Sequence, residues 1–92
     1  MTTALNESGS RTSGDAVPML RGQIDAIDAA ILHLVGERVR LSQRIQTTRV
    51  NGGGTRVELG RERVILAAYR AALGRHGAPL AEAVLQVCRG ER

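Results

Sequence analysis

The chain has 92 residues, which allow one small domain, and 42% of them are hydrophobic. Its formal net charge is +4, and all 13 basic residues are arginine. The arginines are not clustered in a block and Tyr69 is the single aromatic residue, which argues against a nucleic-acid partner. Cys88 is the single cysteine, so the sequence offers no disulfide framework and no cysteine-based metal site.

The sequence also lacks the patterns of membrane insertion and export. No apolar run is long enough to cross a bilayer, and the first residues do not form a secretory signal pattern. We therefore expect a cytoplasmic protein that has no membrane partner.

Residues 1–16 are rich in Ser, Thr and Gly and show no periodicity. We therefore expect a flexible N-terminal tail there and a helical domain over residues 17–92. Residues 20–50 predict one unbroken helix, and Pro18 suits its first turn. Apolar residues recur four and three positions apart in this segment, which is typical of one stripe along a helix. The stripe consists of Leu20, Ile24, Ile27, Ile31, Leu34, Leu41 and Ile45.

The length of this helix predicts a homodimer. Residues 20–50 would span about 46 Å as a helix, whereas a compact domain of this size is roughly 30 Å across. A single chain cannot cover the whole stripe, so the stripe implies a partner. The simplest partner is an identical chain.

The remaining residues predict two shorter helices. Asn51 and the glycines that follow end the first helix, and residues 55–59 predict a connecting loop. A second helix begins near Gly60 or Arg61 and ends at Leu73. Its expected apolar stripe is Val64, Ile65, Ala68, Tyr69, Ala72 and Leu73.

Gly74 and Gly77 bracket the next predicted turn, and Pro79 opens a short third helix. Its expected apolar face is Leu80, Val84, Val87 and Cys88. Because no segment shows a strand pattern, the sequence predicts an all-α fold of three helices, one long and two short, in an intertwined homodimer.

Several charged residues break the helical pattern. Arg38 falls between Leu34 and Leu41 in the apolar stripe, where a guanidinium is costly unless an anion meets it. Arg49 lies three turns later on the same face, roughly 16 Å along the axis. Long side chains allow both arginines to reach one small anion.

Two further arginines extend this pattern. Arg61 lies at a helix N-terminus, where the macrodipole disfavours a cation, while the neighbouring Glu62 is also explained by a helix start. Arg21 lies about 25 Å before Arg38 and is rotated by about 100°. It can share a small-molecule site with Arg38 only across a dimer. The arginines together predict a site for a dianion at a dimer interface.

At these residues the sequence resembles the small all-helical chorismate mutases, the AroQ class, over about residues 18–92. The resemblance rests on the stretches LRGQIDAID, LVGERVRLSQRI and TRVELGRER, and on the spacing of Arg21, Arg38, Arg49, Arg61 and Glu62. The glycine-containing loop and the short third helix are most similar to the actinobacterial subgroup. Members of that subgroup are activated by binding DAHP synthase, so the resemblance implies such a partner.

The resemblance also implies roles for individual residues in a site shared between two chains. Arg21 of one chain and Arg38 of the other would bind the two substrate carboxylates. Arg49 would contact the breaking ether oxygen. Glu62 and Glu58 would hold the C4 hydroxyl, and Arg61 would order that loop and carboxylate.

The third helix supplies the last implied contact. Arg89 would face the ether oxygen, and a small shift of register gives that role to Gln86 instead. Leu85 stands where other members carry serine.

The implied reaction is the intramolecular Claisen rearrangement of chorismate to prephenate, in phenylalanine and tyrosine biosynthesis through the shikimate pathway. It needs no nucleophile, general base, metal or cofactor. The protein must hold the folded conformer of the substrate and place cations where charge develops. His33 and His76 are therefore expected to take no part.

Three other functions stay open at this point. Glu58 adds a carboxylate near the C4 substituent, which would suit the amine of 4-amino-4-deoxychorismate as well as a hydroxyl. An isochorismate pyruvate lyase would use the same fold and a similar set of cations. A non-catalytic dimeric helical module could bind an acidic protein or nucleic acid through its arginines.

Overall fold

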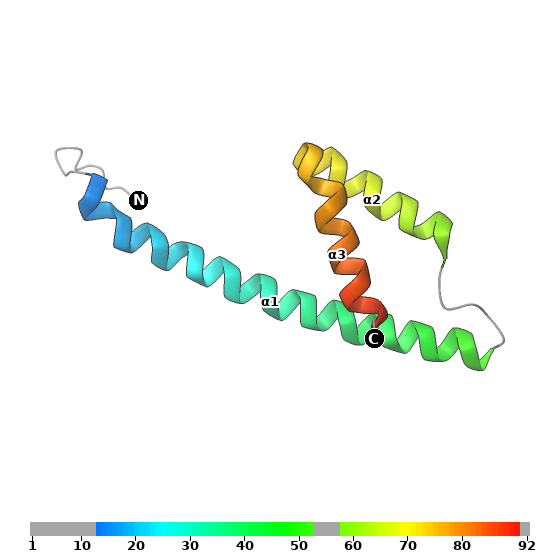
Figure 1. The fold of residues 1–92 in the computed structure, drawn as a ribbon. Helices are drawn as coiled ribbons and strands as arrows, with labels where there is room; N and C mark the ends of the chain where they lie inside the picture. The colour runs from blue at the N-terminus through cyan, green and yellow to red at the C-terminus, as the bar shows by residue number, and fades with distance from the viewer. Residues whose placement is uncertain (1–12, 53–57, 91–92) are drawn as a thin grey trace. The chain divides into compact units, whose positions relative to one another are not determined.

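The computed structural model describes residues 13–52 and 58–90. In chain order these form α1 (Ser13–Asn51), α2 (Leu59–Leu73), the short 3-10 helix η1 (Gly74–His76) and α3 (Gly77–Arg89), as Figure 1 shows. No strand occurs in these two ranges, which confirms the predicted all-α class with one long helix and two short ones. None of the helices in these ranges combines the length and the apolar character needed to cross a membrane.

The chain divides into two compact units, Met1–His33 and Leu34–Arg92, and α1 contributes to both. The described part of the first unit is the first half of α1. Six of its large apolar side chains are at least half exposed to solvent. They are Met19, Leu20, Ile24, Ile27, Ile31 and Leu32. The predicted stripe is therefore present as an uncovered apolar surface.

Helix α1 begins earlier than the sequence predicted. Residues 13–16, assigned to the tail, are already helical, and Asp15 in the first turn complements the positive end of the helix dipole. Pro18 therefore lies inside the helix rather than in its first turn. Because proline has no N–H, the carbonyl four residues earlier loses its usual helical partner. Residues 1–12 of the predicted tail lie outside the described residues.

The core of the second unit lies where α3 packs against α2. Four residues of α3 are buried, at Gly77, Ala81, Leu85 and Cys88, and their spacing places them on one helical face. The predicted face was right at Cys88, which is buried, and at Val84, which is half-buried, and wrong at Leu80 and Val87, which are 47% and 54% exposed.

Close approach of the two helices explains this error. A Cβ atom built on Gly77 would lie 2.2 Å from the Tyr69 carbonyl oxygen of α2. Only small residues fit at this crossing, so Gly77 and Ala81 face α2 and the larger Leu80 turns away. The packing geometry therefore outweighs the apolar pattern.

Helix α2 follows its prediction in part. Ile65 and Tyr69 are half-buried as expected, together with Leu66, which the prediction missed. The other predicted stripe positions are exposed, at Val64, Ala68, Ala72 and Leu73. One packed neighbour covers only a narrow face of a helix, so the rest of the predicted stripe is uncovered in the described chain.

The connections agree closely with the sequence pattern. Helix α1 ends at Asn51, where the Gly52 N–H donates to the Thr48 carbonyl oxygen over 3.0 Å. Glu58 is extended and precedes α2, which begins at Leu59, one residue before the earliest predicted start. Residues 55–57 of the predicted loop lie outside the described residues. The predicted turn at residues 74–77 is η1 and the first residue of α3, which starts two residues before Pro79.

Candidate active site

The second unit contains a cavity of about 420 Å³, a volume typical of a small-molecule site. The second half of α1, the start of α2 and the end of α3 supply its lining. The lining residues are Arg38, Leu41, Ser42, Ile45, Gln46, Arg49, Glu58, Arg61, Glu62, Ile65, Leu85, Cys88 and Arg89. Six of the seven predicted site residues are among them.

Helix α1 presents Arg38 and Arg49 on one face. Both side chains are half-buried and line the cavity, which confirms the shared face predicted from their spacing. Ser42 and Gln46 lie between them on this face and also line the cavity. The sequence analysis missed these two residues, although their positions four and eight residues after Arg38 were a usable signal.

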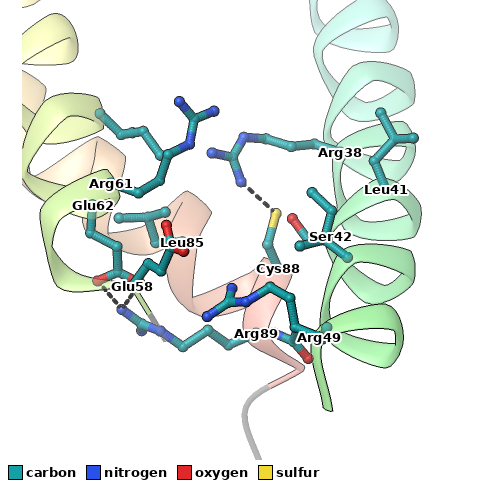
Figure 2. A pocket seen from close by; sticks show the side chains of 13 residues that line it. Arg38, Leu41, Ser42, Arg49, Glu58, Arg61, Glu62, Leu85, Cys88 and Arg89 are labelled. Atoms are coloured by element: carbon teal, nitrogen blue, oxygen red, sulfur yellow. Dashed lines mark hydrogen bonds and ion pairs between the residues drawn. The ribbon is translucent and has the colours of Figure 1, made fainter. Parts of the chain in front are cut away.

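A buried thiol meets the guanidinium of Arg38. The Arg38 Nη1–H donates a hydrogen bond to the Cys88 sulfur over 3.0 Å, and Cys88 is only 3% exposed. Figure 2 shows this contact reaching across the cavity from α1 to α3. The sequence analysis required an anion here, and the observed acceptor is neutral. A neutral acceptor suffices because Arg38 is only half-buried and stays partly hydrated.

The guanidinium of Arg89 instead meets a carboxylate. Its Nη2 donates to both carboxylate oxygens of Glu62, over 2.8 and 2.9 Å, and joins the end of α3 to the first turn of α2. The two side chains are 35% and 19% exposed. This ion pair fixes Arg89 beside the cavity. Gln86, the alternative from the resemblance, is exposed and is not a lining residue.

Arg61 and Glu58 occupy the side of the cavity formed by the start of α2. Figure 2 shows the Arg61 and Arg38 guanidinium groups directed toward one another from opposite sides. Within the described chain, Arg61 makes no hydrogen bond or ion pair through its side chain. The carbonyl oxygen of Glu58 accepts the N–H of Glu62 over 3.0 Å, which holds the first turn of α2.

The charges of the lining suit a small dianion. Four arginines and two glutamates line the cavity, so its lining has a formal charge of +2. Leu41, Ile45, Ile65 and Leu85 add apolar surface. Guanidinium groups bind carboxylates through paired N–H donors. The cavity therefore provides guanidinium groups for an organic anion and an apolar surface for a ring.

The remaining candidates lie away from the lining. Arg21 is an exposed residue of the first unit and is not among the lining residues. His33 is exposed on α1, and His76 in η1 contacts the Arg75 Nε over 3.4 Å. Neither histidine lines the cavity. In residues 13–52 and 58–90, no three His, Cys, Asp or Glu side chains gather closely enough to hold a metal ion.

The described chain therefore combines an all-helical fold with a cavity lined by arginines. Residues 20–89 match the model of the family described as chorismate mutase type II. The chain belongs to this family.

Individual relatives agree with this assignment. The intracellular chorismate mutase of Mycolicibacterium smegmatis is 39% identical over 79 residues, which cover 83% of this chain and 76% of the relative. That of Mycobacterium tuberculosis is 39% identical over 74 residues, covering 80% and 70%. In the complex of DAHP synthase and chorismate mutase from Corynebacterium glutamicum, solved with a transition state analog, one chain is similar with a TM-score of 0.82 and 35% identity. The match covers 87% of this chain and 96% of that one.

Proposed function

We propose that the chain is a chorismate mutase, an isomerase that converts chorismate to prephenate in phenylalanine and tyrosine biosynthesis. The observation that carries this proposal is that one cavity is lined by Arg38, Arg49, Arg61 and Arg89 together, in a chain of the chorismate mutase type II family. The mycobacterial relatives are named intracellular enzymes, which supports the cytoplasm as its location.

The proposed mechanism uses position and charge. Arg38 binds one carboxylate of the substrate, and Arg49 and Arg89 donate toward the ether oxygen, where negative charge grows as its bond to carbon breaks. The bond between the two carbon termini forms as this ether bond breaks, so no proton or group is exchanged with the protein. Fixed cations in a cavity stabilise such a transition state without having to reorient.

The ion pair between Arg89 and Glu62 is compatible with these roles. Arg89 uses one nitrogen for both carboxylate oxygens, so its other N–H donors stay available to a ligand. Each carboxylate oxygen also has a further lone pair, with which Glu62 would accept the C4 hydroxyl. Glu62 thereby orients Arg89, and Arg61 keeps the local charge positive.

We further propose a homodimer in which Arg21 of one chain completes the cavity of the other. The support is the uncovered stripe on α1, where Leu20, Ile24, Ile27 and Ile31 are each at least half exposed. Arg21 lies beside this stripe, and a dicarboxylate needs a second cationic group. Burying the stripe against an identical chain would remove apolar surface from water at about 25 cal/mol per Å².

We also propose that a DAHP synthase binds and activates this chain. The support is that the similar chorismate mutase from Corynebacterium glutamicum was solved in complex with DAHP synthase. A protein bound near the end of α3 would restrain Arg89, which lies in the last turn of that helix.

A second substrate is favoured by one observation. Glu58 lines the cavity together with Glu62, and two carboxylates near one substituent would suit the amine of 4-amino-4-deoxychorismate. The deciding experiment incubates the purified chain with each substrate, with and without a DAHP synthase, and identifies the products by chromatography. Prephenate formation with the higher kcat/KM for chorismate supports the proposal. A higher kcat/KM for 4-amino-4-deoxychorismate supports the second candidate function. No turnover of either substrate under any condition refutes both functions.

A further inference from the structure

The thiol of Cys88 contacts the cavity but has no place in the proposed chemistry. Cys88 lies on the buried face of α3 and is 3% exposed. It is also one of the residues that line the cavity. Its sulfur accepts the Nη1–H of Arg38 from α1 over 3.0 Å. The contact joins residues 50 positions apart in the chain.

Arg38 and Arg89 of the cavity differ in what holds them. Arg89 is held by the carboxylate of Glu62, which compensates its charge. Arg38 is held by a thiol, which is a weak neutral acceptor and leaves the positive charge of the guanidinium uncompensated. A guanidinium is planar and rigid, so one fixed N–H direction restricts the whole plane. The other N–H donors of Arg38 are then left for a ligand.

We propose that Cys88 is a positioning residue for Arg38. Its sulfur holds the guanidinium toward the cavity in an orientation that meets a substrate carboxylate, without lowering the attraction of Arg38 for that anion. This inference rests on the proposed function, in which Arg38 binds a carboxylate of the substrate. Cys88 itself acts through Arg38 and touches no reacting atom.

The role predicts a particular kinetic pattern. The contact between Arg38 and a carboxylate exists both in the bound substrate and in the transition state, so its loss raises KM and leaves kcat nearly unchanged. Cys88→Ser retains a neutral acceptor at this position, and Cys88→Ala removes it. The loss of one modest hydrogen bond corresponds to a KM increase of about fivefold.

The test measures kcat, KM for chorismate and the thermal unfolding midpoint for the wild type, Cys88→Ser, Cys88→Ala and Val87→Ala. Val87 is the matched control because it precedes Cys88 on α3, is over half exposed and does not line the cavity. We expect wild-type KM within about twofold for Cys88→Ser and Val87→Ala, and the fivefold rise only for Cys88→Ala. Equal KM values for the Ser and Ala variants, or a change confined to kcat, overturn the inference.

A second measurement covers the case in which Cys88→Ala does not fold. Nitrogen resonances of the Arg38 guanidinium, assigned by their loss in Arg38→Lys, are compared between the wild type and Cys88→Ser. A shift of these resonances supports the contact, and unchanged resonances overturn it. The wild-type assay separates the two proposals. A wild type that is inactive both with and without a DAHP synthase refutes the proposed function, whereas an active wild type with unchanged Arg38 resonances refutes the positioning role alone.

Discussion

The two units of the chain differ in their packing, because the buried core and the cavity described above both lie in the second unit. In the first unit, large apolar residues of α1 such as Ile24 and Ile27 are more than half exposed. In the second unit, the buried residues of α3 include Gly77 and Ala81, and charged groups surround a cavity. The first unit therefore has a surface that needs a partner, and the second has a site that needs a ligand. The homodimer we propose would cover the surface of the first unit and bring its Arg21 to the ligand site of the partner.

The largest expected effect comes from removing the central cation of the second unit. Arg38→Ala should lower kcat/KM for chorismate by about a hundredfold or more, since one group aimed at substrate charge is lost. The unfolding midpoint of the ligand-free protein should not fall, because the substitution also removes a half-buried charge. Steady-state kinetics and thermal unfolding check the two parts. Wild-type turnover in this variant would show that Arg38 takes no part in binding or turnover of chorismate.

The next effect separates the stripe of the first unit from the opposite side of α1. Ile27→Asp places a charge in the apolar stripe and should weaken the dimer by about a hundredfold, since burying an unpaired carboxylate is costly. Ala29→Asp is the matched control, because Ala29 lies on the opposite face of the helix. Sedimentation equilibrium measures the dimer dissociation constant of each variant. Equal dissociation constants for the two variants would show that the stripe is not the dimer interface.

A smaller effect tests the close packing inside the second unit. Gly77→Ala puts a methyl group against the Tyr69 carbonyl and should destabilise the fold by about 1–3 kcal/mol. Gly60 lies on α2, and a methyl group added there by Gly60→Ala meets no atom within 4 Å. This variant should therefore be neutral or slightly stabilising. Chemical denaturation of the two variants gives the comparison. Similar unfolding free energies for the two variants would show that α2 and α3 do not pack tightly at Gly77.

The smallest expected effect concerns salt. A dianion in a partly buried cavity is screened less than one on an exposed surface, so KM for chorismate should rise by less than about threefold between 50 and 200 mM salt. A surface that binds a polyanion by counterion release loses affinity far more steeply over that range. Kinetic assays at constant pH measure the difference. A rise of about a hundredfold would favour an open basic surface over the cavity.

The sequence predicted what depends on local periodicity. The presence of the three helices, the shared face of Arg38 and Arg49, and the apolar stripe of α1 all follow from spacing along one helix, whereas the starts of the helices were predicted one to several residues late. The buried face of α3 does not, because the approach of Tyr69 to Gly77 selects small residues there.

Contacts between distant parts of the chain were also beyond the sequence pattern. The ion pair of Arg89 with Glu62 spans 27 positions, and periodicity within one helix carries no information about it. The neutral acceptor at Arg38 was unexpected for the same reason, since Cys88 was assigned only to an apolar face. The resemblance placed Arg89 near the site, and the structure adds the group that holds it.

The most direct test of a site shared between two chains mixes Arg21→Ala protein with Arg38→Ala protein, each inactive alone. In a mixed dimer one of the two sites has both arginines. Random exchange therefore predicts recovery of on the order of a quarter of wild-type activity. Subunit exchange is confirmed by native mass spectrometry of the mixture. Recovery near this level is the result the account predicts, and no recovery in a mixture that has exchanged would contradict it.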